Sequence, residues 1–293
     1  MHRDALISAI LSFIGEQDLL SLDDTGRTLR REFDQVSDYA LAALKTRLTA
    51  DDGWTYYPPD PISRRIHHVL ADTFLTHDSE VHGAQYFDQL GSRPVVIFAN
   101  HLSYADANVI DVLLERSGAS ALANRLTAIA GPKVFTSRER RFSSLCFGNI
   151  KVPQSVDVST GEAVLGPREV ARAARASIDV AHARLASGDA LLLFGEGTRS
   201  RSGGLQPMLP GVARYLEGPD AWVLPVGLTG SEDIFPVDGS RIRPGRVIMR
   251  AGAPLQAAAL LKRSAGDRRK AMDSIGGMIA SLLPPAYRGT YAT

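Results

Sequence analysis

The sequence predicts an α/β fold: a mixed, largely parallel sheet flanked by helices and preceded by a small N-terminal helical domain. Two observations support this prediction. Before residue 80, apolar residues recur at spacings of three and four, which is typical of amphipathic helices. From about residue 90, short apolar runs alternate with helical patterns, which is typical of strands and helices sharing one sheet. We therefore divide the chain into residues 1–85, a helical bundle, and residues 86–293, an α/β domain.

The N-terminal region contains at least three predicted amphipathic helices. Prolines in residues 57–61 interrupt the pattern, and Ser63 is the predicted cap of the third helix. The polar face of the first helix lacks a stripe of lysine and arginine, so we expect it to pack on a core, with a membrane surface as the alternative. The predicted inward-facing residues are Leu6, Ile7, Ile10, Leu11, Ile14, Leu29, Phe33, Val36, Ala40, Leu44, Leu48, Ile66, Val69, Leu70 and Phe74.

The predicted α/β domain contains five strands and a long helix between the second and the third. Pro167 suits the first position of that helix, an alanine-rich segment over 168–186, and Gly188 suits its end. The predicted strands are residues 94–99, 127–130, 190–194, 221–228 and 246–251.

Composition excludes several classes of protein. A formal net charge of +1 argues against a nucleic-acid-binding protein that depends on bulk positive charge. The single cysteine, Cys146, forms no internal disulfide and fits a reducing compartment, so we expect a cytoplasmic protein. No apolar run approaches the roughly 20 residues of a membrane-spanning helix, and residues 5–14 lack the flanks of a signal peptide.

The first candidate site lies directly after the strand predicted at 94–99. His101 and Asp106 fall in the turn between this strand and the next helix, where α/β folds place reactive groups. A histidine there can act as a general base towards an alcohol, and a carboxylate can orient its ring and stabilise the imidazolium. A hydrogen bond with a core or capping role is the alternative for this pair.

The second candidate site follows the strand predicted at 190–194. Residues 195–204 form a glycine-rich loop that contains arginines. Glycine lets the backbone approach an anion closely, and arginine presents a planar set of donors to phosphate oxygens. The loop is therefore a predicted phosphate-binding segment, and an ion pair between Glu196 and Arg199 that braces the loop is the alternative.

Three segments together resemble the glycerolipid acyltransferase family, which includes glycerol-3-phosphate and lysophosphatidate acyltransferases. Residues 100–106 resemble its first block, of the H-x4-D type, residues 194–200 its third, and residues 223–228 its proline-containing fourth. The resemblance covers about residues 90–255. The helical region before these blocks makes the layout similar to the soluble plastid-type glycerol-3-phosphate acyltransferases.

The resemblance implies roles for individual residues. It implies that His101 is the general base, that Asp106 orients it, and that Arg199 binds the phosphate of the acceptor. The second block, which usually ends in an arginine, matches poorly, because residues 153–155 read Pro-Gln-Ser. Phosphate binding then falls to other basic residues of 131–151, with Arg140 and Arg141 among the alternatives, or the acceptor differs from the usual one of the family. The full predicted substrate-binding set is Lys133, Arg138, Lys151, Glu196, Gly197, Thr198, Arg199, Ser200 and Arg201.

The resemblance also implies the substrates. The acyl donor is acyl-CoA or acyl carrier protein, and the acceptor is a phosphate-bearing or lipid alcohol such as glycerol 3-phosphate or a lysophospholipid. We expect no cofactor, no metal ion and no nucleic acid. A cytoplasmic location is expected, with peripheral contact at the inner face of the membrane as a further expectation. The alternatives are a thioesterase or metal-assisted esterase that uses His101, Asp106 and Glu196, and a non-catalytic lipid-binding protein on the same fold.

Overall fold

The computed structural model describes residues 3–14, 22–50, 53–153, 166–218, 220–236 and 242–292. The helices in this part of the chain are α1 (Arg3–Ile14), α2 (Leu22–Asp34), α3 (Asp38–Thr49), α4 (Pro61–Phe74), α5 (Gln85–Leu90), α6 (Asp106–Arg116), α7 (Ser120–Ala123), α8 (Arg138–Ser144), α9 (Pro167–Ala186), α10 (Ser231–Ile234), α11 (Ala257–Arg263) and α12 (Arg268–Leu282). The strands are β1 (Tyr56–Tyr57), β2 (Glu80–His82), β3 (Val95–Ala99), β4 (Leu126–Ala130), β5 (Gly148–Lys151), β6 (Ala190–Phe194), β7 (Trp222–Thr229), β8 (Ile248–Ala251) and β9 (Leu255–Gln256).

The strands form one mixed sheet in the order β1-β5-β4-β6-β3-β7-β8-β2, with β9 paired to β7. The interior pairs β5–β4, β4–β6, β6–β3 and β3–β7 are parallel. The pairs β1–β5, β7–β8 and β7–β9 are antiparallel. The predicted α/β class with a largely parallel sheet is confirmed, and each of the five predicted strands forms within two residues of its predicted bounds.

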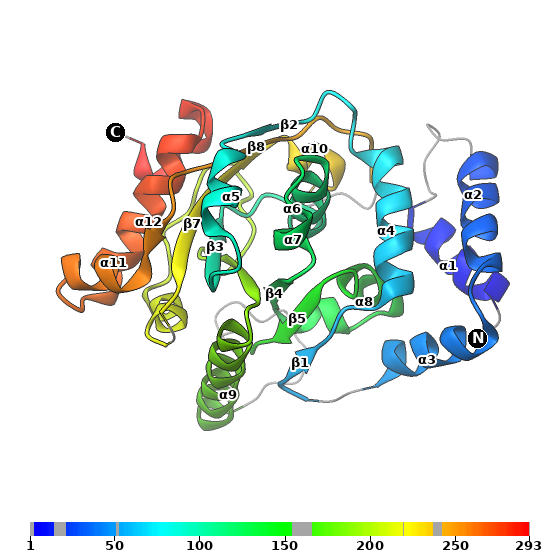
Figure 1. The fold of residues 1–293 in the computed structure, drawn as a ribbon, viewed down its shortest axis with the longest axis horizontal. Coiled ribbons are helices and arrows are strands. Elements are labelled where there is room, and N and C mark those ends of the chain that lie inside the picture. The colour runs from blue at the N-terminus through cyan, green and yellow to red at the C-terminus, as the bar shows by residue number, and fades with distance from the viewer. Residues whose placement is uncertain are drawn as a thin grey trace.

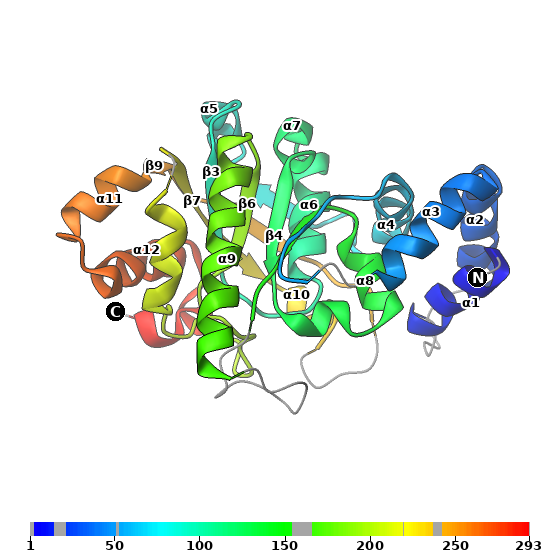
Figure 2. The same cartoon turned by 90° about the horizontal axis from the view of Figure 1, so that it is seen from below.

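Two layers of helices cover the sheet because successive side chains of each strand point to opposite faces. Val95 and Ile97 of β3 join a hydrophobic cluster with residues of α1 to α4 and α6. Val96 and Phe98 join a second cluster with residues of α9 and α12. Figure 1 shows α1, α2 and α3 grouped at one end of the molecule and α11 and α12 at the other, and Figure 2 shows the same separation.

The N-terminal helices form largely as the periodicity predicts, with two differences. The apolar residues from Leu29 to Leu48 lie on two helices and, for Val36, in the turn between them, because the Ser37 side chain accepts the N–H of Ala40 and starts α3. The predicted cap Ser63 is wrong: Asp60 caps α4 through the N–H groups of Ile62 and Ser63, which puts Ser63 inside the first turn. Pro61 at the first helical position favours this earlier start.

Two short strands within residues 1–85 were not predicted. Strand β1 pairs with β5, and β2 pairs with β8, so this region also contributes to both edges of the sheet. Strands of two or three residues carry too little periodicity to be recognised in a sequence. The boundary at residue 85 stays a prediction. Among the described helices, none combines the length and apolar character needed to cross a bilayer.

Candidate active site

The centre of the sheet brings two of the predicted segments together. In the register of the sheet, Ala99 at the end of β3 lies between Phe194 of β6 and Val226 of β7. Because these three strands are parallel, the loops that follow β3 and β6 leave the sheet at the same edge. His101 and Glu196, which are 95 residues apart in the chain, therefore lie side by side.

His101 and Asp106 form a hydrogen-bonded pair. Nδ1 of His101 lies 2.7 Å from Oδ2 of Asp106, a carboxylate with no exposed surface. The same oxygen accepts the backbone N–H groups of Leu102 and Ser103, and Ser231 Oγ donates to Oδ1 at 2.6 Å. These donors favour a charged carboxylate that acts as an acceptor, which assigns the proton of the pair to Nδ1 of the imidazole.

The other imidazole nitrogen of His101, Nε2, is the one available for proton transfer. The ring of Phe194 stacks on the imidazole, with centroids 4.1 Å apart and planes 15° apart. The side chain of His101 is 20% exposed, and it lines the large cavity described below. With Nδ1 bonded to Asp106 and the ring plane held by Phe194, Nε2 is the nitrogen able to accept a proton.

The loop after β6 holds the backbone of His101 from both sides. Glu196 Oε1 accepts the His101 N–H at 2.7 Å, and the Ser200 N–H donates to the His101 carbonyl at 2.7 Å. Glu196 Oε2 accepts the N–H of Gln206 at 2.8 Å. Burial raises the pKa of Glu196 to about 7, although the two N–H donors oppose the rise. The Glu196 carboxylate therefore connects the backbone at His101 with the backbone at Gln206 by accepting one N–H from each.

Two further residues of these loops have conformational roles. The amide of Asn100 donates to the Leu228 carbonyl at 3.0 Å and accepts the Leu228 N–H at 2.7 Å, which ties the end of β3 to β7. Gly197 has φ +71°, in the left-handed region that strains other residues. The three segments that carry the family resemblance are thus directly connected.

A cavity of about 1010 Å³ opens in front of His101. Apolar side chains from α4, α6, α8 and α9 form much of its wall, among them Leu70, Phe74, Val112, Phe142, Val170 and Ile178. Of the predicted site residues, it is lined by His101, Lys133, Glu196, Gly197, Thr198, Arg199 and Arg201. A long apolar wall with a few polar groups at one place suits an amphipathic substrate.

The other predicted site residues lie outside this lining. Asp106 and Ser200 are buried behind the loops, and the Ser200 hydroxyl donates to the Gly204 carbonyl. Arg138 is exposed on α8. The Lys151 ammonium lies over the rings of Trp54 and Phe135, at 5.1 and 5.5 Å from their centroids. Residues 154–155 of the poorly matching block are outside the described residues.

Sequence reasoning missed Ser231 and Tyr104. Ser231 is 125 residues from Asp106, and no local pattern connects the two. Tyr104 lies inside the H-x4-D segment and lines the cavity beside Arg199. An aromatic residue three positions after the histidine was the available signal for Tyr104.

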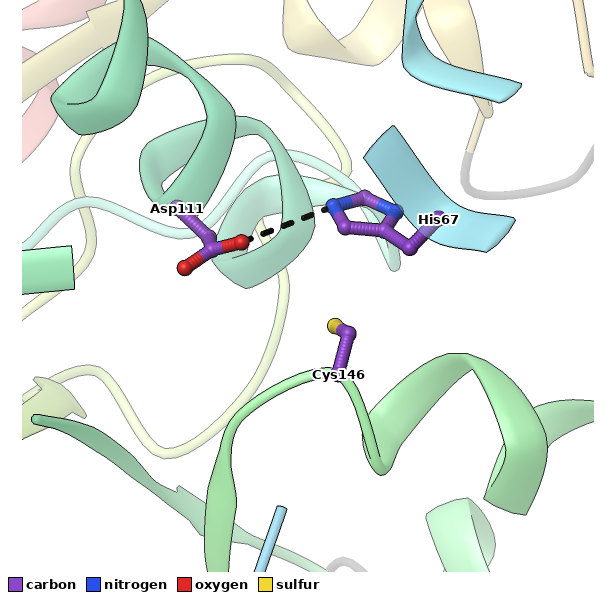
Figure 3. Close-up of side chains that lie close together, drawn as sticks. All are labelled: His67, Asp111 and Cys146. Carbon is purple, nitrogen blue, oxygen red and sulfur yellow. Dashed lines mark ion pairs between the residues drawn. The ribbon is translucent and has the colours of Figure 1, made fainter. Parts of the chain in front are cut away.

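A second group of ionisable residues lies away from the His101 loop. Figure 3 shows His67 of α4, Asp111 of α6 and Cys146 with their polar atoms converging, within 4.8 Å of one another. Each atom has another partner, since His67 Nε2 contacts the Asn108 carbonyl and Cys146 Sγ donates to that of Ser143.

The charge beside this group argues against a cation. The guanidinium of Arg64 lies 2.8 Å from Asp111 and would repel a metal ion there. Burial lowers the pKa of His67 to about 4 and raises that of the Cys146 thiol. We therefore assign this group a packing role, as a hydrogen-bonded contact between α4 and α6.

Comparison with known proteins identifies the family of this chain. The acyltransferase family model matches residues 78–229, from β2 to the end of β7. The structure is similar to that of PlsC, the 1-acyl-sn-glycerophosphate (LPA) acyltransferase from Thermotoga maritima, with a TM-score of 0.50 and 19% identity over 96% of this chain and 95% of that chain. At that identity the likeness is one of fold. No curated protein matches the sequence. Because the family match spans more than half of the chain, the protein belongs to the acyltransferase family and is an acyltransferase enzyme.

Proposed function

We propose that the protein transfers a fatty acyl group from a thioester, acyl-CoA or acyl carrier protein, to a hydroxyl of a phosphate-bearing glycerolipid acceptor. Glycerol 3-phosphate and lysophospholipids are the acceptors that the family suggests. One observation carries the proposal: the His101–Asp106 pair, at 2.7 Å, faces a cavity whose wall is apolar and whose polar residues include Arg199 and Lys133. The apolar wall suits the acyl chain, and the cations suit the phosphate.

The geometry supports a single-displacement reaction. Nε2 of His101 takes the proton of the acceptor hydroxyl as its oxygen attacks the thioester carbonyl carbon. The tetrahedral intermediate collapses with cleavage of the carbon–sulfur bond, and the imidazolium returns the proton to the leaving thiolate. Asp106 stabilises the imidazolium through Nδ1, as the carboxylate of a protease triad does. The proposed reaction uses no cofactor and no metal ion.

Ser103 takes no covalent part in this proposal. Its hydroxyl donates to the Phe235 carbonyl at 2.9 Å and accepts the Ala105 N–H. Both contacts hold the turn between His101 and Asp106. A nucleophilic serine would need its oxygen beside the base, and here the acceptor hydroxyl fills that role.

Acyl transfer by the purified protein tests the proposal. Radiolabelled acyl-CoA and acyl carrier protein donors are each incubated with glycerol 3-phosphate, lysophosphatidate and lysophosphatidylglycerol, and the products are identified by mass. We expect an ester product with the wild type and none with His101→Ala of unchanged melting temperature. Release of free fatty acid at the same rate with and without acceptor would establish the thioesterase alternative. Loss of that release with a chelator would identify its metal-assisted form.

A further inference from the structure

Residues 285–292, here called the C-terminal segment, pack on the loop after β6. They contain two short 3-10 helices beside α12, at the end of the molecule away from α1 to α3 (Figure 1). The Leu205 N–H donates to the Tyr287 carbonyl at 2.9 Å, and the Thr290 N–H donates to the Leu205 carbonyl at 3.0 Å. The C-terminal segment therefore binds both backbone groups of a buried loop residue.

Gly289 permits this close contact. Its φ is +50°, in the left-handed region, and a Cβ atom placed on it would lie 2.2 Å from the Leu205 carbonyl oxygen. Tyr291 adds another contact, because its hydroxyl accepts the Met208 N–H at 3.1 Å. Its ring lies over Gly276, where a Cβ atom would be 2.3 Å from Cζ of the tyrosine. The C-terminal segment thus joins the loop after β6 to α12.

The loop bound in this way is the one that holds His101. Gln206 follows Leu205 directly, and its N–H donates to Glu196 Oε2 at 2.8 Å, while Glu196 Oε1 accepts the His101 N–H. A displacement of Leu205 would move the Gln206 N–H with it, because both belong to one planar peptide unit. The position of the His101 backbone is therefore linked to the C-terminal segment through the loop.

The same segment also reaches the partner of His101. The Tyr287 hydroxyl donates to Glu232 Oε1 at 2.5 Å, and Glu232 Oε2 accepts the Gly230 N–H at the start of α10. Glu232 follows Ser231, which donates to Asp106 Oδ1. Burial and the Glu232 carboxylate raise the pKa of the Tyr287 hydroxyl, which keeps it protonated as a donor. Tyr287 therefore binds the loop after β6 with its carbonyl and α10 with its hydroxyl.

We propose that the C-terminal segment positions the His101–Asp106 pair for proton transfer, with Tyr287 as its main positioning residue. This inference rests on the proposed function, in which His101 is the general base. The segment lies beyond residues 78–229, which the family model matches. A general base must lie within hydrogen-bond distance of the hydroxyl that it deprotonates, so small displacements of the imidazole lower kcat. Binding of an acyl chain to the apolar wall depends less on this geometry, so KM should change little.

Tyr287→Phe tests the contact with α10, because it removes the hydroxyl and keeps the ring. We expect kcat for acyl transfer to fall about 3- to 10-fold, with KM within about twofold of the wild-type value. In a Ser231→Ala background the same substitution should lower kcat less than about twofold, because Tyr287 acts on Asp106 through Ser231. An equal loss of kcat in both backgrounds, or a rise in KM at unchanged kcat, would contradict the proposal.

Gly289→Ala tests the contact with the loop after β6, and Gly266→Ala is the matched control. Gly266 also has a positive φ, +74°, but the described part of the chain, apart from its two neighbours, places no atom within 4 Å of an added Cβ. Both variants share the backbone strain, and only Gly289→Ala displaces Leu205. We expect it to lower kcat about tenfold or more. It should also speed amide hydrogen exchange in residues 100–103 and 204–208, and Gly266→Ala should change neither quantity. Equal effects of both variants would show a general loss of stability and overturn the positioning role.

The nitrogen chemical shifts of the His101 ring separate this proposal from the proposed function, because they need no turnover. They are recorded on the full chain labelled with 15N-histidine and assigned by their loss in His101→Ala. We expect Tyr287→Phe to shift the Nδ1 resonance, and an unchanged resonance would overturn the positioning role. If no acceptor is acylated but the resonance shifts, the positioning role stands and the transfer reaction does not. If the wild type transfers an acyl group and both Tyr287→Phe and Gly289→Ala keep its kcat, the reaction stands and the positioning role does not.

Discussion

Helix α6 carries two buried aspartates, Asp106 in its first turn and Asp111 in its middle, and each lies beside a histidine. Asp106 holds His101 at 2.7 Å, and Asp111 holds His68 at 3.0 Å, with His67 at 3.9 Å. The two pairs have the same side-chain chemistry. Their surroundings differ, and those surroundings decide which pair is suited to catalysis.

The partners of each carboxylate explain the difference. Asp106 accepts hydrogen bonds from backbone N–H groups and a serine, so a protonated His101 imidazole would be its cationic partner. Asp111 already contacts the guanidinium of Arg64, which also pairs with Glu115. The positive charge of the arginine partly offsets the negative charge of the carboxylate, so this carboxylate stabilises an imidazolium less. This difference supports the proposal that His101, and not His67 or His68, is the general base.

The largest expected effect comes from the same substitution at both aspartates. Asp106→Asn should lower kcat about 10³- to 10⁴-fold, because the amide no longer fixes and stabilises the imidazole as a carboxylate does. Asp111→Asn should leave kcat within about threefold and lower the free energy of unfolding by about 2–4 kcal/mol, because Arg64 loses its buried partner. Steady-state kinetics and urea unfolding measure the two effects. A loss of activity in Asp111→Asn with unchanged stability would reverse our assignment.

The two regions should also respond to pH in opposite directions. The pKa of His67 is about 4 in the folded protein and 6.5 in the unfolded chain. Its contribution to stability is complete above pH 6.5 and is lost as pH falls from 6.5 through 4. The pKa of Glu196 is about 7 when folded and 4.5 when unfolded. Its contribution is complete below pH 4.5 and is lost as pH rises from 4.5 through 7.

Two variants separate these opposing contributions, each about 3 kcal/mol at most. The stability difference between wild type and His67→Gln should shrink as pH falls from 7 to 4.5, because only the wild type loses stability through His67. The difference between wild type and Glu196→Gln should shrink as pH rises over the same range. Urea midpoints at closely spaced pH values measure both. If the stability difference between wild type and either variant does not change with pH, the substituted residue of the wild type has the same pKa in the folded and the unfolded protein.

A smaller effect is expected from the serine behind Asp106. Ser231→Ala removes the donor to Oδ1 and should lower kcat about 5- to 50-fold with little change in KM, because the carboxylate loses part of its orientation. Ser231→Thr keeps the hydroxyl and should recover part of this loss. Ser103→Ala is the matched control, because the Ser103 hydroxyl donates to the Phe235 carbonyl and not to Asp106. An equal loss of kcat in Ser231→Ala and Ser103→Ala would indicate a general loss of order around the His101 turn.

The elements with strong periodicity were predictable from the sequence. β3, β6 and β7 are apolar runs longer than four residues, and α9 is a helix of 20 residues with a proline start. Strand β5 was not predicted, because Gly148 and Asn149 interrupt its apolar pattern. The cap of α4 was misplaced because Asp60 and Ser63 are both good capping residues, and only the position of Pro61 separates them.

The candidate site was predictable where its residues are close in the chain. His101 and Asp106 stand out together because only four residues lie between them, in the turn from β3 to α6. Arg140 lines the cavity and Arg138 does not. The sequence could not predict this difference, because the direction of a side chain on α8 depends on how that helix packs. The contact of Ser231 with Asp106 depends on strand order, which pairs β3 with β7 across more than a hundred residues.

The smallest effect is expected at Cys146, the third residue of the group around Asp111. Its thiol donates to the Ser143 carbonyl and accepts from the Asn108 amide, and both are weak hydrogen bonds. Cys146→Ala should therefore cost about 1 kcal/mol in unfolding free energy and change kcat less than about twofold. Burial raises the pKa of the thiol, so the wild type should react with a thiol reagent at pH 8 far more slowly than the urea-unfolded chain. Rapid labelling of the native protein, or loss of turnover in Cys146→Ala, would mean that this group is open to substrate. The distinction between the surroundings of Asp106 and those of Asp111 would then fail, because the group around Asp111 would be a second reactive centre.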